Sequence, residues 1–127
     1  MLQRAETASD SLVIEGTRID LIERGKGRPI FVNFTAAWCI TCQVNDKAAL
    51  STPQVKAALA STGTTYMIAD ATRYDPRIDE ALAGFGRVGL PLYVVYPANG
   101  GAPVILPQVL SAGMVASALA HAAGPVA

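Results

Sequence analysis

The sequence predicts an α/β fold in which a small mixed sheet is covered by helices on both faces. Short apolar runs, typical of buried strands, alternate along the chain with segments whose apolar residues recur at helical spacing. A cluster of turn-forming residues at 97–101 then predicts an antiparallel hairpin near the end of the chain. Together these observations favour a three-layer sandwich.

Length and charge favour one domain without a polyanion partner. The 127 residues include ten basic and ten acidic side chains, and 51% of the residues are apolar. A chain of this size can bury a substantial core, and its balanced charge provides no basic surface, so no nucleic-acid partner is expected. We expect the domain over 11–124, after a linker or disordered segment over 1–10. Residues 1–10 also lack the apolar core of a signal peptide.

The first elements are expected before residue 36. Residues 12–14 form a short apolar run consistent with an edge strand. Residues 17–24 fit either a strand or a short helix, and we favour the helix because Thr17 can cap its start and Gly25 can end it. A loop over 25–29 then leads into a buried strand at 30–35.

Capping residues and apolar spacing define the later elements. Helices are expected at 39–50 and from Thr52 to Gly63, and another begins after Asp75. The remaining elements are strands at 65–69, 92–96 and 104–106 and a closing helix at 111–123.

Two cysteines, Cys39 and Cys42, follow the predicted strand at 30–35 and open the next helix. They are the only cysteines in the chain. Residues three apart on a helix share a face, near enough for their sulfurs to bond. A pair with this spacing beside a strand–helix pattern is typical of a redox motif. A helix N-terminus favours negative charge, so we expect Cys39 to supply the nucleophilic thiolate.

Asp46 is the candidate proton acceptor for this chemistry. Thiol–disulfide exchange passes through a mixed disulfide that a second thiol must resolve, and that thiol must lose a proton. Asp46 lies one helical turn after Cys42, so its carboxylate can accept the proton directly or through water. No cofactor is expected for this reaction.

Other interpretations of the cysteine pair stay open at this point. The pair can be an inert disulfide in an adaptor domain, or it can hold copper(I), which prefers soft thiolate ligands. Zinc normally takes four ligands, and the single histidine, His121, lies on the alanine-rich final helix. A zinc site is therefore not predicted, and we favour exchange chemistry and assign no metal ligands.

Several segments carry a resemblance to a known family. The run Trp38-Cys39-Ile40-Thr41-Cys42 after an apolar strand, with Gly89-Leu90-Pro91 opening a later strand, resembles thioredoxin-fold domains. More narrowly, residues 34–46 resemble the C-terminal domain of transmembrane thiol:disulfide interchange proteins of the DsbD and ScsB type. The likeness continues at 51–55, 69–72 and 89–91, and it covers about residues 28–100.

This resemblance implies a thioredoxin-like electron-relay domain in the periplasm, as a soluble part of a membrane protein. Such a domain takes electrons from a membrane-embedded domain, of the same or another chain, and passes them to a protein with an exchangeable disulfide. By matching positions, Cys39 is the exposed attacking thiol and Cys42 the buried resolving thiol. Pro91 is the cis-proline beside them, where its preceding peptide can pair with a bound chain.

The sequence departs from thioredoxins at two places. Thioredoxins carry a buried Asp at the position of Asn33, and an amide cannot act as the base, so Asn33 is expected only to form hydrogen bonds or hold water. The dipeptide Ile40-Thr41 replaces their Gly-Pro, so their reduction potential cannot be transferred. Trp38 is expected either to pack in the core or to form part of a contact surface.

Overall fold

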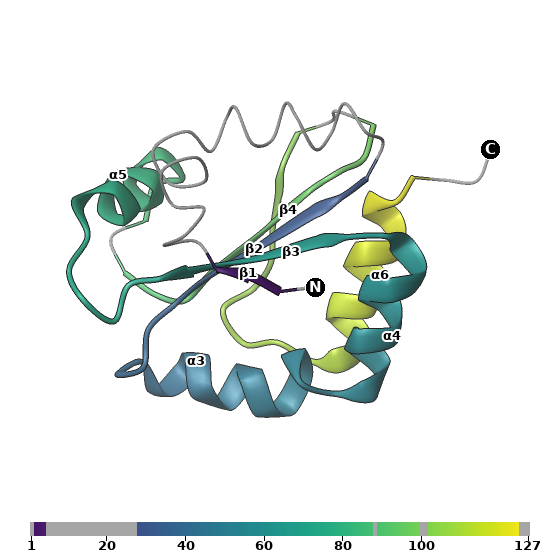
Figure 1. Cartoon of the computed structure of the whole chain (residues 1–127), viewed down its shortest axis with the longest axis horizontal. Coiled ribbons are helices and arrows are strands. Elements are labelled where there is room, and N and C mark those ends of the chain that lie inside the picture. Colours follow the sequence, from purple (N-terminus) through teal and green to yellow (C-terminus); the bar gives the residue numbers. More distant parts are fainter. Residues whose placement is uncertain (1, 5–27, 88, 100–101, 125–127) are drawn as a thin grey trace.

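The computed structural model describes residues 2–4, 28–87, 89–99 and 102–124. Within these residues a central sheet lies between helices, with α5 on one side and α3, α4 and α6 on the other (Figure 1). This arrangement confirms the predicted α/β sandwich. The strand expected at 12–14 and the helix expected at 17–24 lie outside the described residues.

In the described part of the chain, the sheet has five strands in the order β1-β3-β2-β4-β5. Strands β1 and β2 run parallel to β3, whereas β4 is antiparallel to β2 and β5 is antiparallel to β4. The sheet is therefore mixed, and the predicted hairpin is confirmed. The strand bounds are β1 (Leu2–Arg4), β2 (Ile30–Thr35), β3 (Thr65–Asp70), β4 (Leu92–Tyr96) and β5 (Val104–Ile105).

Strand β1 lies within residues 1–10, for which the sequence predicts a linker or a disordered segment; residues 1 and 5–10 lie outside the described part of the chain. Leu2–Arg4 pairs with β3, and Leu2 lies opposite Tyr66. The free edge of a strand presents unpaired backbone N–H and C=O groups, which another segment can satisfy whatever its side chains are. This pairing depends on backbone groups far along the chain, so local composition did not indicate it.

The helices begin and end where the capping residues predict. Thr52 accepts a hydrogen bond from the Val55 N–H at 3.3 Å, and Gly63 ends the same helix in the left-handed conformation, which a residue without Cβ adopts easily. Asp75 and Ser111 cap the last two helices in the same way. The helical segments are α3 (Ile40–Asn45), η1 (Asp46–Leu50), α4 (Pro53–Thr62), α5 (Pro76–Gly84) and α6 (Ala112–Ala122).

The helix expected over 39–50 is divided into two parts. α3 ends at Asn45, and η1 continues it as a π-helical turn in which the Ser51 N–H bonds the Asp46 carbonyl at 2.7 Å. Within η1, Leu50 is buried whereas Asp46 remains exposed. Such wide turns are frequently found at functional sites.

Alternating residues of β2 point into two separate parts of the core. Ile30, Val32 and Phe34 pack on the side of α5, together with Ile78 and Leu82 of that helix. The opposite face of the sheet packs against α4, α6 and η1, and its buried residues include Phe31, Val55, Tyr93, Val115 and Leu119. Packing on both faces of the sheet therefore holds β2 in place. The cysteine pair follows directly after this strand.

Candidate functional site

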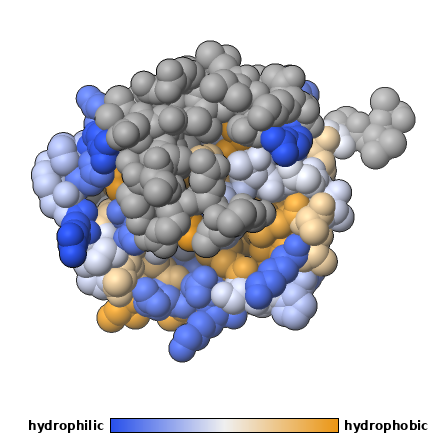
Figure 2. All heavy atoms as spheres, in the orientation of Figure 1, coloured by the Kyte–Doolittle hydropathy of each residue, from blue (hydrophilic) through white to orange (hydrophobic). Residues whose placement is uncertain are grey.

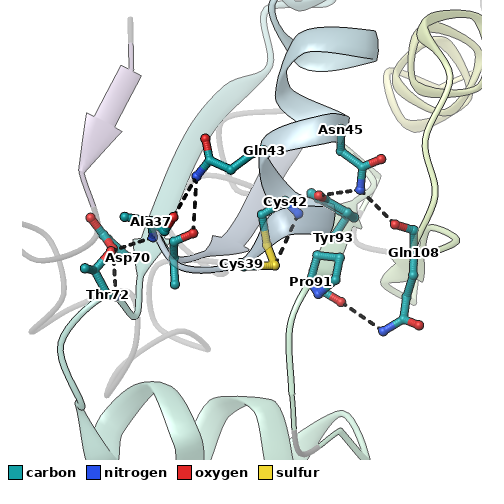
Figure 3. The surroundings of a disulfide bond; sticks show 11 residues. Ala37, Cys39, Cys42, Gln43, Asn45, Asp70, Thr72, Pro91, Tyr93 and Gln108 are labelled. Atoms are coloured by element: carbon teal, nitrogen blue, oxygen red, sulfur yellow. Dashed lines mark hydrogen bonds between the residues drawn. A yellow bond between two sulfur atoms is a disulfide. The ribbon is translucent and has the colours of Figure 1, made fainter.

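Cys39 and Cys42 form a disulfide at the start of α3 (Figure 3). Their Cα atoms are 5.2 Å apart, within the range that a disulfide requires. Cys39 is the N-cap of the helix, and its Sγ accepts a hydrogen bond from the Cys42 backbone N–H at 3.2 Å. The predicted position of the pair at a helix N-terminus is thus confirmed, and the same N–H can stabilise a thiolate on Cys39 after reduction.

Cys39 is more covered than the sequence predicts, whereas Cys42 is buried as expected. Cys39 is 8% exposed and Cys42 is 3% exposed, so Cys39 is the more accessible by a small margin. Ala36 belongs to the same buried cluster, and Ala71 and Leu90 pack against it. The expected exposed thiol is therefore nearly covered in the disulfide form, because segments distant in the sequence close around it.

The peptide between Leu90 and Pro91 is cis, as the resemblance implies. Pro91 directly precedes β4, whose first residue pairs with Phe34 near the end of β2. Leu90 packs against the cysteine cluster, so the cis peptide lies beside the disulfide. The Pro91 carbonyl accepts a hydrogen bond from Gln108 Nε2 at 3.4 Å (Figure 3).

The loop before Cys39 is fixed by the segment that follows β3. The Thr72 hydroxyl accepts a hydrogen bond from the Ala37 N–H at 2.8 Å, and the Thr72 carbonyl accepts one from Trp38 Nε1 at 3.2 Å. Asp70 in turn accepts from the Thr72 N–H at 2.9 Å. Sequence reasoning assigned no role to Thr72 or Asp70. Asp70 ends β3 and Thr72 follows it, and β3 is parallel to β2. The carboxyl ends of parallel strands meet at one edge of a sheet, so this position is the signal that could have indicated both residues.

Trp38 is exposed, so it is not a core residue. It retains 63% of its accessible surface, and Ile40, on the other side of Cys39, retains 80%. Figure 2 shows hydrophobic surface interspersed with hydrophilic residues on one described face of the molecule. The large apolar residues exposed in the described part of the chain are Trp38, Ile40, Val44, Tyr74, Val104, Ile105 and Val109.

A pocket of about 230 Å³ brings together Cys42, Asp46 and Asn33. Asn33 is buried, its Nδ2 donates to the Tyr66 hydroxyl at 3.0 Å, and its Oδ1 has no partner among the described residues. Burial raises the pKa of Tyr66 to about 12; the hydrogen bond from Asn33 opposes the shift, and the negative charge of Asp46 adds to it. The predicted proton acceptor and the predicted water-holding amide therefore lie in one pocket with Cys42.

Asn45 is a buried polar residue that sequence reasoning missed. It is 1% exposed, and its Nδ2 donates to the Tyr93 hydroxyl at 2.8 Å and to the Gln108 carbonyl at 2.7 Å. Its Oδ1 accepts from the Leu110 N–H at 3.0 Å. A buried polar atom left without a partner costs about 1–3 kcal/mol, so these bonds strongly favour one arrangement. Its only sequence signal is its spacing of three from Cys42, on the same helix face.

In the described part of the chain, no group of three or more His, Cys, Asp or Glu side chains is placed to hold a metal ion. Among the described helices, none combines the length and the apolar character that crossing a membrane requires.

Comparison with known proteins gives one family and several relatives. A family model described as thioredoxin-like matches residues 23–98. The thiol:disulfide interchange protein DsbD of Klebsiella pneumoniae subsp. pneumoniae is 30% identical over 79 residues, or 62% of the chain. DsbD of Escherichia coli strain K12 is 32% identical over 75 residues, or 59% of the chain. In both cases the match spans only 13% of the relative's length.

Solved structures confirm the fold. The C-terminal domain of Neisseria meningitidis DsbD in its oxidised form superposes with a TM-score of 0.69 at 20% identity, covering 95% of this chain and 98% of that one. A thioredoxin from Thermus thermophilus gives 0.65 at 18% identity, covering 94% and 84% respectively. The described architecture is therefore that of the thioredoxin fold.

Proposed function

The chain belongs to the thioredoxin-like family, and we propose that it exchanges electrons with other proteins through Cys39 and Cys42. The observation that carries the proposal is the closed Cys39–Cys42 disulfide at the start of α3, beside the cis Leu90–Pro91 peptide. The names of the DsbD relatives, which describe thiol:disulfide interchange, support the same activity.

The proposed reaction has two steps and moves two electrons. In the reduced protein, the Cys39 thiolate attacks one sulfur of a partner's disulfide, so a Cys39–partner bond forms and a partner thiolate leaves. The Cys42 thiolate then attacks the Cys39 sulfur, which closes Cys39–Cys42 and releases the second partner thiolate. The partner is reduced and this protein is oxidised. A dithiol of another protein returns the disulfide form to the dithiol by the reverse steps.

Asp46 is the proposed acceptor of the proton that the Cys42 thiol loses. Asp46 and Cys42 line the same pocket, and Asp46 is exposed there, so it can pass the proton on to solvent. Asn33 offers a buried oxygen without a partner among the described residues, which suits it to hold a water between the two groups. Asn33 thus has a supporting role, while Asp46 serves as the base.

The relay that the resemblance implies completes the proposal. Electrons come from a membrane-embedded domain, of the same or another chain, and go to an extracytoplasmic protein with an exchangeable disulfide. The domain then works in the periplasm. The DsbD relatives support this placement, and they are much longer proteins than the matched segment.

Equilibration with glutathione buffers tests the proposed activity. The protein is incubated over a series of glutathione ratios, quenched with acid and alkylated, and its free thiols are counted by mass spectrometry. We expect one two-electron transition while the near-ultraviolet circular dichroism of the folded state persists. A disulfide that stays closed down to about −300 mV, or that opens only when the protein unfolds, would identify a structural staple instead.

A further inference from the structure

Asn45 joins three parts of the candidate site through one side chain. It belongs to α3, the helix that Cys39 caps, and it is buried below that helix. Its amide group binds the Gln108 carbonyl at 2.7 Å and the Leu110 N–H at 3.0 Å. The backbone on both sides of Val109 is thereby attached to the cysteine helix.

Gln108 extends this attachment to the cis peptide. Its side-chain Nε2 donates to the Pro91 carbonyl at 3.4 Å, while its own carbonyl is bound by Asn45 (Figure 3). Val109, which lies between the two bound peptide groups, remains 70% exposed. The segment 108–110 therefore presents an apolar side chain to solvent from a backbone that is fixed relative to Pro91.

We propose that Asn45 is a positioning residue for exchange with protein disulfides. It holds the segment 108–110, and through Gln108 the Leu90–Pro91 peptide, at fixed positions relative to Cys39. A polypeptide that carries a reactive disulfide has to bring its sulfur to the nearly covered Cys39, and the Leu90–Pro91 peptide beside the disulfide, with the segment bound to it, offers a fixed surface for the flanking chain. Glutathione disulfide carries only a γ-glutamyl and a glycyl group beside each cysteine, so its reaction depends far less on this attachment than that of a protein disulfide. The inference rests on the proposed function, because it concerns access to the same cysteines.

Two variants test the inference with two disulfide probes. Asn45→Leu has a similar volume and removes all three hydrogen bonds, whereas Gln108→Met keeps the bond of the backbone carbonyl and removes the contact with Pro91. Reduced protein is mixed with insulin or with glutathione disulfide, and the rate of a single turnover is measured. We expect Asn45→Leu to react at least tenfold more slowly with insulin, and Gln108→Met about threefold more slowly. Both variants should react with glutathione disulfide within twofold of the unaltered protein.

Matched controls separate positioning from general destabilisation. Tyr93→Phe removes the third hydrogen bond of Asn45 but leaves its bonds to Gln108 and Leu110. Gln54→Met makes the same chemical change as Gln108→Met at an exposed position of α4. We expect both controls to react with both probes at the rates of the unaltered protein, even where Tyr93→Phe lowers the melting temperature.

The outcomes are distinct. Equal slowing with insulin and glutathione disulfide would show a merely structural role and overturn the inference, as would an unchanged insulin rate in folded Gln108→Met. Gln108 is exposed, so the Gln108→Met variant still tests the inference if Asn45→Leu does not fold. An unaltered protein that reacts with neither insulin nor glutathione disulfide would instead contradict the proposed function itself.

Discussion

The Sγ of Cys39 accepts a hydrogen bond from the backbone N–H of Cys42 at 3.2 Å. The residue proposed to resolve the mixed disulfide therefore also supplies a donor to the sulfur proposed to attack. A hydrogen bond to the charged form of a group stabilises that form, so this contact favours the thiolate of Cys39 in the reduced protein. No equivalent donor to the Cys42 sulfur is found among the described residues.

Alkylation should distinguish the two thiols. In reduced protein at pH 7, we expect Cys39 to react with iodoacetamide at least about tenfold faster than Cys42, because a thiolate is the reactive form. The reaction is run with a limiting amount of reagent, and the labelled peptides are quantified by mass spectrometry. Equal labelling of both cysteines would remove the basis for naming Cys39 the nucleophile.

Loss of the Asp46 carboxylate should slow resolution of the mixed disulfide. In Asp46→Asn, Cys42 must lose its proton to solvent, so we expect a several-fold lower rate at pH 7 and a pH profile displaced upward. Stopped-flow exchange with glutathione disulfide between pH 5 and pH 10 measures the profile.

Glu80→Gln is the matched control for Asp46→Asn, since it removes one exposed carboxylate from α5. Its profile should match that of the unaltered protein. If Asp46→Asn also gives an unchanged profile, Asp46 has no part in the proton transfer.

The negative charge of Asp46 should also affect the ionisation of Tyr66 at high pH. Its pKa is raised to about 12 mainly by burial, with a contribution from Asp46. Because the folded-state pKa lies above the unfolded value of 10.0, this group's stabilising contribution is complete below pH 10 and is lost as the pH rises to about 12. We expect a loss of up to about 2 kcal/mol in the free energy of unfolding over that interval.

Absorbance of tyrosinate and urea unfolding measure the two effects of Tyr66. Tyr66→Phe should lack the ionisation near pH 12, and Asp46→Asn should move it to lower pH because the repelling charge is gone. An ionisation of Tyr66 that does not move in Asp46→Asn would show that the carboxylate does not act on it.

Local patterns in the sequence predicted the parts of the fold that local forces determine. The caps at Thr52 and Asp75 lie at the starts of helices because each side chain satisfies a backbone N–H of the first turn. The cysteine pair was placed correctly for the same reason, since its strand and its helix are neighbours in the chain. The hairpin into β5 likewise joins two strands that are neighbours in the chain.

Features that depend on distant segments were not predicted. Asn45 has no local feature that distinguishes it from an exposed polar residue of a helix, because its hydrogen-bond partners, Tyr93 and the segment 108–110, are distant in the sequence. The coverage of Cys39 by Ala71 and Leu90 arises from two loops that are remote in the sequence. Periodicity describes which face of an element is apolar, but it does not say which other element will meet that face.

Trapping of a mixed disulfide tests the central claim most directly. Reduced Cys42→Ala and Cys39→Ala variants are mixed with insulin, and the products are mapped by mass spectrometry. The account predicts that Cys42→Ala accumulates a long-lived disulfide between Cys39 and insulin, because the resolving thiol is missing, whereas Cys39→Ala forms little or none. Accumulation through Cys42 alone, or no mixed disulfide with either variant, would contradict it.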